Sequence, residues 1–84
     1  MKHFVYILYS IKTDKYYIGS SSNIENRLIK HNLGGTTSTR PGRPWKIVYK
    51  ETLNSKREAL IREKQIKKKK SRKYIEWLIQ CSGN

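Results

Sequence analysis

The segment His3–Ser10 (HFVYILYS) constrains the fold most, because it is apolar on both faces of an extended chain. Its side chains alternate between two sets, with Phe4, Tyr6 and Leu8 on one face and Val5, Ile7 and Tyr9 on the other. This alternation predicts a strand, and two apolar faces suit a strand in the interior of a sheet. The segment lacks a small-residue cleavage site, so we interpret it as a strand and not as a signal peptide.

Two further strands and a loop are predicted. The polar turn Lys12–Lys15 is followed by Tyr16–Gly19, which resumes the extended pattern and completes a hairpin with the first strand. Trp45–Leu53 is the third strand, and one of its faces is expected to carry Trp45, Ile47 and Tyr49. Between helix and strand, Gly34–Pro44 (GGTTSTRPGRP) is expected to be a flexible arm and not a packed element.

Capping residues and apolar spacing predict three helices. The first begins at the motif Ser22-x-x-Glu25 and stops near Gly34, with an apolar stripe of Ile24, Leu28 and Ile29. The second begins at Ser55-x-x-Glu58, and the third begins at about Ser71 with an apolar side of Tyr74, Ile75, Leu78 and Ile79. The order β-β-α-β-α-α predicts an α+β fold in which helices pack on a small antiparallel sheet. With 84 residues, the chain is expected to form one domain over 1–80 and a short C-terminal tail over 81–84.

The charge of the chain points to a polyanionic partner. Nineteen Lys and Arg residues against six Asp and Glu residues give a formal net charge of +13. Such self-repulsion opposes compaction unless a polyanion relieves it, which favours nucleic acid over a membrane surface or an acidic protein. The apolar runs are too short for a membrane span. The single cysteine, Cys81, cannot form an internal disulfide, and no Cys/His cluster suggests zinc, so a cytoplasmic location is expected.

Several polar residues are expected to point toward the core. On a helix that starts at Ser55, Glu63 shares a narrow arc with Ala59 and Ile66, where a carboxylate is costly unless it is paired or holds a metal. A salt bridge to Arg27 or to a lysine further along the chain is the alternative to a metal. Arg27 and His31 lie at the edge of the first helix's apolar stripe, and for His31 alone an ordinary hydrogen-bonded histidine is the better interpretation.

Two tyrosines are expected to lie near these groups. Tyr6 and Tyr17 can occupy neighbouring strands and the same face of the hairpin. A single buried tyrosine is commonly part of the core, with its hydroxyl hydrogen-bonded. Two hydroxyls, an arginine and a carboxylate that converge would instead combine a proton acceptor, a phosphate clamp and a ligand for a hard metal.

The ordered set of these motifs resembles the GIY-YIG endonuclease domain. Phe4-Val5-Tyr6, Tyr17-Ile18-Gly19, Arg27 in a helix and Glu63 in a later helix follow the order of that family. The likeness is greatest to its small stand-alone members, which are related to the nuclease domain of the UvrC repair protein. It extends over nearly the whole chain through VYIL, YYIG, NRLIKHN, VYKE and EALIREKQIKK.

The resemblance implies a three-stranded antiparallel sheet flanked by helices and metal-dependent hydrolysis of DNA phosphodiester bonds, linked to repair or recombination. The metal would be Mg²⁺ or Mn²⁺. The implied roles are activation of the attacking water by Tyr6, orientation of water and phosphate by Tyr17, binding of the scissile phosphate by Arg27, ligation of one divalent ion by Glu63, assistance near the reacting oxygens by His31, and close backbone approach at Gly19.

Two positions depart from the family pattern. Phe4 replaces the glycine of the first motif, where the chain only needs to form a strand. Tyr74-Ile75-Glu76 stands where family members commonly carry a polar residue, often asparagine, after the glutamate. The second departure keeps an alternative open, namely a non-catalytic DNA- or RNA-binding module on the same scaffold. A third interpretation is a basic protein that docks on ribosomal RNA or on an acidic partner.

The basic tail, Arg62–Lys73 (REKQIKKKKSRK), is a second candidate surface. It is either a solvated face or a contact with the nucleic-acid backbone, which gives affinity without sequence specificity. The residues expected to reach phosphate are Arg40 and Arg43 in the loop and Lys67, Lys68, Lys69, Lys70, Arg72 and Lys73 in the tail. A chain this short is expected to take its selectivity from the structure of the DNA or from a partner protein.

Overall fold

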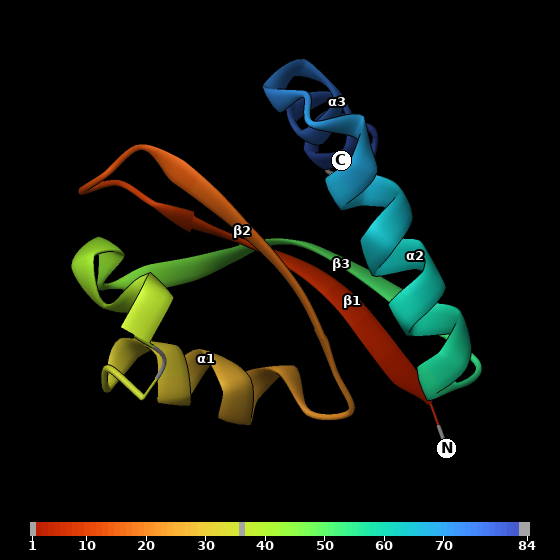
Figure 1. The fold of residues 1–84 in the computed structure, drawn as a ribbon, viewed down its shortest axis with the longest axis horizontal. Coiled ribbons are helices and arrows are strands. Elements are labelled where there is room, and N and C mark those ends of the chain that lie inside the picture. Colours follow the sequence, from red (N-terminus) through yellow and green to blue (C-terminus); the bar gives the residue numbers. More distant parts are fainter. Residues whose placement is uncertain (1, 36, 83–84) are drawn as a thin grey trace.

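Helices cover both faces of a three-stranded antiparallel sheet in the computed structural model, which describes residues 2–35 and 37–82 (Figure 1). The elements, in chain order, are β1 His3–Ser10, β2 Lys15–Ser21, α1 Ile24–Asn32, the 3₁₀ helix η1 Thr37–Gly42, β3 Trp45–Leu53, α2 Lys56–Lys69 and α3 Arg72–Ser82. The α+β class and the order β-β-α-β-α-α are confirmed. Since α3 runs to Ser82, the predicted C-terminal tail begins inside a helix, and its last two residues lie outside the described part of the chain.

The strand order β2-β1-β3 places β1 in the middle of the sheet, as its two apolar faces predict. β1 pairs with β2 in a register that sets Tyr6 opposite Gly19 and Leu8 opposite Tyr17. Because side chains alternate along a strand, Tyr6 and Tyr17 share one face of the hairpin. That face looks toward α1 and η1, while α2 and α3 cover the other face (Figure 1).

A bulge in β3 changes which of its side chains share a face. Ile7 pairs with Tyr49 and Leu8 pairs with Ile47, so Val48 is the extra residue. Ile47 and Trp45 therefore pack on the α1 side, whereas Tyr49 packs on the α2–α3 side. The expectation that Tyr49 would share a face with Trp45 and Ile47 was wrong, because strict alternation does not survive an inserted residue.

Helix caps follow the sequence with one exception. Ser55 caps α2 by accepting from the Glu58 N–H at 3.2 Å, which confirms the second motif. At α1 the cap is Asn23, whose side chain accepts from the Asn26 N–H at 3.0 Å, so the choice of Ser22 was wrong by one residue. Gly34 ends α1 as predicted and has a φ of +82°, a conformation that glycine adopts without a Cβ penalty.

The loop that was expected to be a flexible arm is packed against the site face, so that prediction was wrong. η1 carries Thr39, which is 1% exposed, and the Trp45 indole N–H donates to the Thr39 carbonyl at 2.7 Å. Asn32 fastens the end of the loop with two bonds to the Trp45 backbone, accepting from its N–H at 2.6 Å and donating to its C=O at 3.1 Å. The loop therefore forms a wall of the α1 side.

Candidate active site

Three aromatic side chains from β1, β2 and α1 meet on the α1 face of the sheet. Tyr6 is 1% exposed, and its hydroxyl lies 3.4 Å from Nε2 of His31, which is also buried. The Tyr17 ring stands edge-on to His31, with 4.9 Å between the ring centroids. We call Tyr6, Tyr17, Arg27 and His31 the tyrosine site. Tyr6 and Tyr17 both contact His31, and Arg27 projects from the same face of α1 as His31.

Gly19 makes room for the Tyr6 phenol. A Cβ at position 19 would lie 2.6 Å from the Tyr6 hydroxyl oxygen, 2.7 Å from Tyr6 Cζ and 3.2 Å from the Tyr17 ring. These separations are too short for any side chain at position 19 unless the phenol moves. The glycine of the YIG motif thus has a steric task at the site, consistent with the close approach expected from the sequence.

His31 is held by a partner that was not predicted. Its Nδ1 lies 2.9 Å from the hydroxyl oxygen of Thr39, which belongs to η1. Burial, together with the charges of Arg27 and Lys30, lowers the pKa of His31 below its ordinary value, so the ring is neutral at pH 7. A neutral imidazole has one donor and one acceptor nitrogen. When the proton is on Nδ1, it is shared with Thr39, and Nε2 faces Tyr6 as an acceptor.

Arg27 lies one helical turn before His31 on α1, so both side chains project from the same face of the helix. Its Nε is buried and has no hydrogen-bond partner among the described residues. A buried guanidinium donor without an acceptor is costly and marks a position where an acceptor from outside the chain would be stabilised. An oxyanion is the acceptor that a guanidinium binds best.

Tyr6 keeps its proton at neutral pH. Burial raises the pKa of its hydroxyl above 10.0, and the nearby Arg27 guanidinium opposes this increase without cancelling it. The charges of Tyr17 and Glu63 raise the pKa further.

Glu63 is paired with the basic tail. Its Oε2 accepts from Lys67 Nζ at 2.6 Å, and its side chain is 17% exposed. Of the two salt-bridge partners considered from the sequence, a lysine of the tail is therefore the one observed. The described residues contain no group of three or more His, Cys, Asp or Glu side chains able to hold a metal. A single carboxylate suits Mg²⁺ or Mn²⁺, which keep several waters and bind through one or two carboxylates and substrate phosphate.

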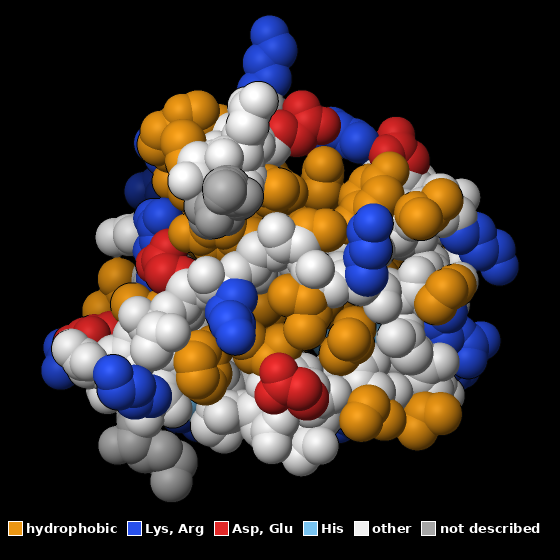
Figure 2. Space-filling model, turned by 180° about the vertical axis from the view of Figure 1, so that it is seen from behind, with side chains coloured by type: hydrophobic (Ala, Val, Ile, Leu, Met, Phe, Trp, Pro, Cys, Tyr) orange, Lys and Arg blue, Asp and Glu red, His pale blue; other side chains and the backbone are white. Residues whose placement is uncertain are grey.

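The residues predicted to contact nucleic acid differ in how many bonds their side chains already make within the chain. Some of their nitrogens already bond within the chain: Arg40 Nε donates to Gly34 O at 2.7 Å, and Arg43 Nε donates to Arg40 O at 3.0 Å. In the tail, Lys69 lies over the Tyr74 ring and Arg72 pairs with Asp14 and Glu76, while Lys68, Lys70 and Lys73 are exposed. Figure 2 shows hydrophobic side chains between the lysines and arginines of one face.

Sequence reasoning missed three contributors to the site, namely Thr39, Asn32 and Trp45 in its structural role. Their contacts span intervals that no local motif covers, since Thr39 bonds His31 from η1 and Asn32 bonds Trp45 thirteen residues away. A threonine within a stretch rich in glycine, proline and arginine gives no periodic signal. Glu76 lies in the segment that departs from the family pattern after Glu63, and its carboxylate accepts a hydrogen bond from Arg72 Nε at 3.1 Å.

The part of the chain that carries the site is similar to known proteins. The model of the GIY-YIG catalytic domain matches residues 2–75. A UPF0213 protein of Staphylococcus saprophyticus is 45% identical over 67 residues, which are 79% of this chain and 80% of the relative. A UPF0213 protein of Bacillus licheniformis is 40% identical over 78 residues, covering 88% and 79% of the two chains.

A solved structure has a similar fold. The solution NMR structure of a UPF0213 protein from Bacillus halodurans is 34% identical, has a TM-score of 0.62, and is matched over 100% of this chain and 88% of that one. No helix in the described part of the chain is long and apolar enough to cross a membrane.

Proposed function

The chain belongs to the GIY-YIG catalytic domain family, a nuclease family, and on that premise we propose that it is a divalent-metal-dependent endonuclease that hydrolyses DNA phosphodiester bonds. The observation that carries the proposal is that the buried hydroxyl of Tyr6 lies against His31, whose ring meets Tyr17, with Arg27 one helical turn before His31.

Arg27 is proposed to bind the scissile phosphate. Its buried, unpartnered Nε supports this role, because a phosphate oxygen would supply the missing acceptor. The guanidinium would then neutralise charge that develops on the phosphate in the transition state. A divalent cation on Glu63 would supply further neutralisation of that charge.

Tyr6 and His31 are proposed to move the proton of the attacking water. Because its raised pKa keeps Tyr6 protonated, the phenol can accept a proton from water only if its own proton passes to another group. Neutral His31 offers Nε2 at 3.4 Å from the Tyr6 hydroxyl, and Thr39 holds the other nitrogen. Tyr17, edge-on to His31, would orient water and phosphate, and Gly19 keeps the phenol in place.

A non-catalytic DNA- or RNA-binding module is the second candidate. Two observations favour it: Lys67 occupies the carboxylate expected to bind metal, and the raised pKa of Tyr6 disfavours a phenolate. Under either function, exposed Lys68, Lys70 and Lys73 are proposed to contact phosphates, with selectivity supplied by DNA structure or by a partner protein in repair or recombination.

Cleavage assays with Glu63→Gln test the proposal. Supercoiled, nicked, branched and single-stranded DNA would be incubated with Mg²⁺ or Mn²⁺, and with a chelator as a blank. We expect Glu63→Gln to lose about 100-fold or more in cleavage rate while binding of DNA stays near the wild-type level. Glu25→Gln, which changes an exposed glutamate of α1 in the same way, is the control and should cut normally. Wild-type protein that binds every substrate and cuts none would support the binding module.

A further inference from the structure

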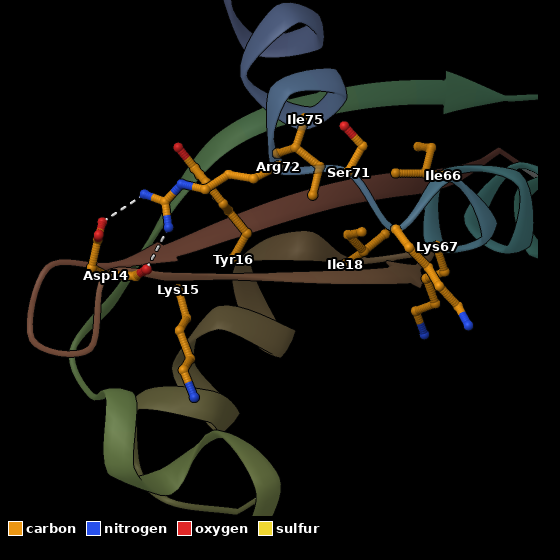
Figure 3. Close-up of a pocket in the computed structure, with 10 residues that line it drawn as sticks. Asp14, Lys15, Tyr16, Ile18, Ile66, Lys67, Ser71, Arg72 and Ile75 are labelled. Atoms are coloured by element: carbon orange, nitrogen blue, oxygen red, sulfur yellow. Dashed lines mark hydrogen bonds and ion pairs between the residues drawn. The ribbon is translucent and has the colours of Figure 1, made fainter.

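A cavity of about 350 Å³ lies where the end of α2 and the start of α3 meet β2. Its floor is apolar, made by Ile18, Ile66 and Ile75, and its rim is cationic, with Lys15, Lys67, Lys70 and Arg72. Figure 3 shows the pair of Asp14 and Arg72 at one end and Lys67 at the other, with Ile18 and Ser71 between them. We call this the α2–α3 cavity. Its rim carries four cations and one carboxylate, Asp14, and this excess of positive charge suits an anion.

The two ends of the cavity differ in how firmly their cations are held. Arg72 donates to the Asp14 carbonyl at 2.8 Å and to its carboxylate at 2.7 Å, bonds Glu76 at 3.1 Å, and lies over the Tyr16 ring. Lys67 has one acidic partner among the described residues, Glu63, and its side chain is 51% exposed. Arg72 is therefore a fixed wall, whereas Lys67 is free to exchange its partner.

Lys67 connects the cavity to Glu63, the proposed metal ligand. It lines the cavity, and its ammonium bonds the Glu63 carboxylate at 2.6 Å. We propose that Lys67 is an exchangeable counter-ion: when a nucleic-acid phosphate occupies the mouth of the α2–α3 cavity, Lys67 turns to that phosphate and releases Glu63 to a divalent cation. This inference rests on the proposed metal role of Glu63 and adds an order of events to it.

The physical basis is competition between cations for one carboxylate. While Lys67 holds Glu63, a divalent ion must displace an ammonium and bear its repulsion. The Lys67 end of this i,i+4 ion pair is half exposed, so water weakens the pair and a phosphate with its own negative charge can draw the lysine away. Because coupling between two binding sites is reciprocal, the phosphate should raise metal affinity and the metal should raise phosphate affinity.

Mn²⁺ binding, followed by electron paramagnetic resonance of the free ion, tests the exchange without relying on cleavage. The proteins are wild type, Lys67→Gln and Lys56→Gln, which removes the same charge from an exposed lysine at the start of α2, outside the basic tail. Each is titrated alone and with a short single-stranded oligonucleotide that has hydrolysis-resistant phosphorothioate linkages. Lys67→Gln alone should bind Mn²⁺ about two- to fivefold tighter than wild type, and Lys56→Gln should resemble wild type. The oligonucleotide should tighten Mn²⁺ binding by wild type and by Lys56→Gln, and much less by Lys67→Gln.

Equal Mn²⁺ affinities and equal effects of the oligonucleotide in all three proteins would overturn the exchange and leave the proposed function standing. Glu63→Gln separates the two ideas. If it binds Mn²⁺ as wild type does, the metal role of Glu63 is wrong and the exchange falls with it. If Mn²⁺ binding is lost in Glu63→Gln and tightened in Lys67→Gln, both are supported.

Discussion

The two faces of the sheet share the central strand β1 but differ in what they bury. On the α2–α3 face, Val5 and Ile7 join an aliphatic core completed by Ala59, Ile66 and Leu78. On the α1 face, Tyr6 and Leu8 lie with Ile24 and Trp45, and two polar side chains, His31 and Thr39, are buried beside them. Alternation along one strand therefore lets the chain put most of its aliphatic core on one side and its candidate chemistry on the other.

Polar networks on the two faces differ as well. On the α2–α3 face, Tyr49 donates to Glu51 at 2.5 Å, and Arg62 pairs with the other oxygen of that carboxylate at 2.8 Å. Burial and the bond to Glu51 raise the pKa of Tyr49 to about 12. Among residues 2–35 and 37–82, that network pairs the Tyr49 hydroxyl and both Glu51 oxygens, whereas the tyrosine site leaves Arg27 Nε without an acceptor. A complete network serves structure, and an incomplete one fits a site that binds a ligand.

The aliphatic face should show the largest effect on stability. Ile7 is fully buried, so Ile7→Ala should lower the free energy of unfolding by about 2–5 kcal/mol. For a domain of this size such a loss is a large part of the total stability, so cleavage should fail through unfolding. Urea denaturation followed by circular dichroism measures the change. Cleavage that recovers at low temperature in step with the folded fraction would show that Ile7 acts only through the core.

Two tyrosine variants, one on each face of the sheet, test which face carries the activity. Tyr6→Phe removes a buried hydroxyl and Tyr49→Phe a partly buried one, and each should cost about 0.5–1.5 kcal/mol of stability. Only Tyr6→Phe should suppress cleavage, by about 100-fold or more, because general base assistance is lost. Rates at several pH values and urea denaturation of both variants check this. Folded Tyr6→Phe that cuts at the wild-type rate would remove Tyr6 from the mechanism.

The smallest expected effect is a pH dependence of stability at the α1 face. The pKa of His31 is lowered in the folded state, so below about pH 6.5 the unfolded chain binds the proton better and the folded state loses stability. Wild type should therefore lose stability between about pH 7 and about pH 5, and His31→Gln should lose less over that window. His3→Gln, at the other histidine, is the control. Urea denaturation at each pH gives the free energy of unfolding. If this free energy changes equally with pH in all three proteins, the lowered pKa of His31 is not the cause.

The sequence predicted much, but not all, of which side chains lie on each face of the sheet. Both faces of β1, the common face of Tyr6 and Tyr17, and the cap at Ser55 depend on local spacing, which a sequence displays directly. The face of Tyr49 depends on a bulge opposite Ile7 and Leu8, and a bulge is set by the pairing of whole strands. It could not be read from the alternation within β3.

The loop was mispredicted for a related reason. Its composition suits a mobile segment, yet Thr39 gains a partner in His31 and its carbonyl accepts from Trp45. These bonds exist only after α1 and β3 have packed, so tertiary contacts override local preference. The sequence predicted that Tyr6, Tyr17 and His31 lie near one another, as they do, but gave no sign of this support from η1.

The strand order β2-β1-β3 has a colloidal consequence. β2 and β3 each pair with β1 alone within the described part of the chain, so the sheet has two outer edges on which another molecule's strand can add. At a formal net charge of +13, two copies repel one another before their edges can meet. Salt screens that repulsion over about 8 Å at physiological ionic strength. The charge proposed to attract nucleic acid is thus also expected to keep copies of the protein apart, and concentrated salt should remove both effects together.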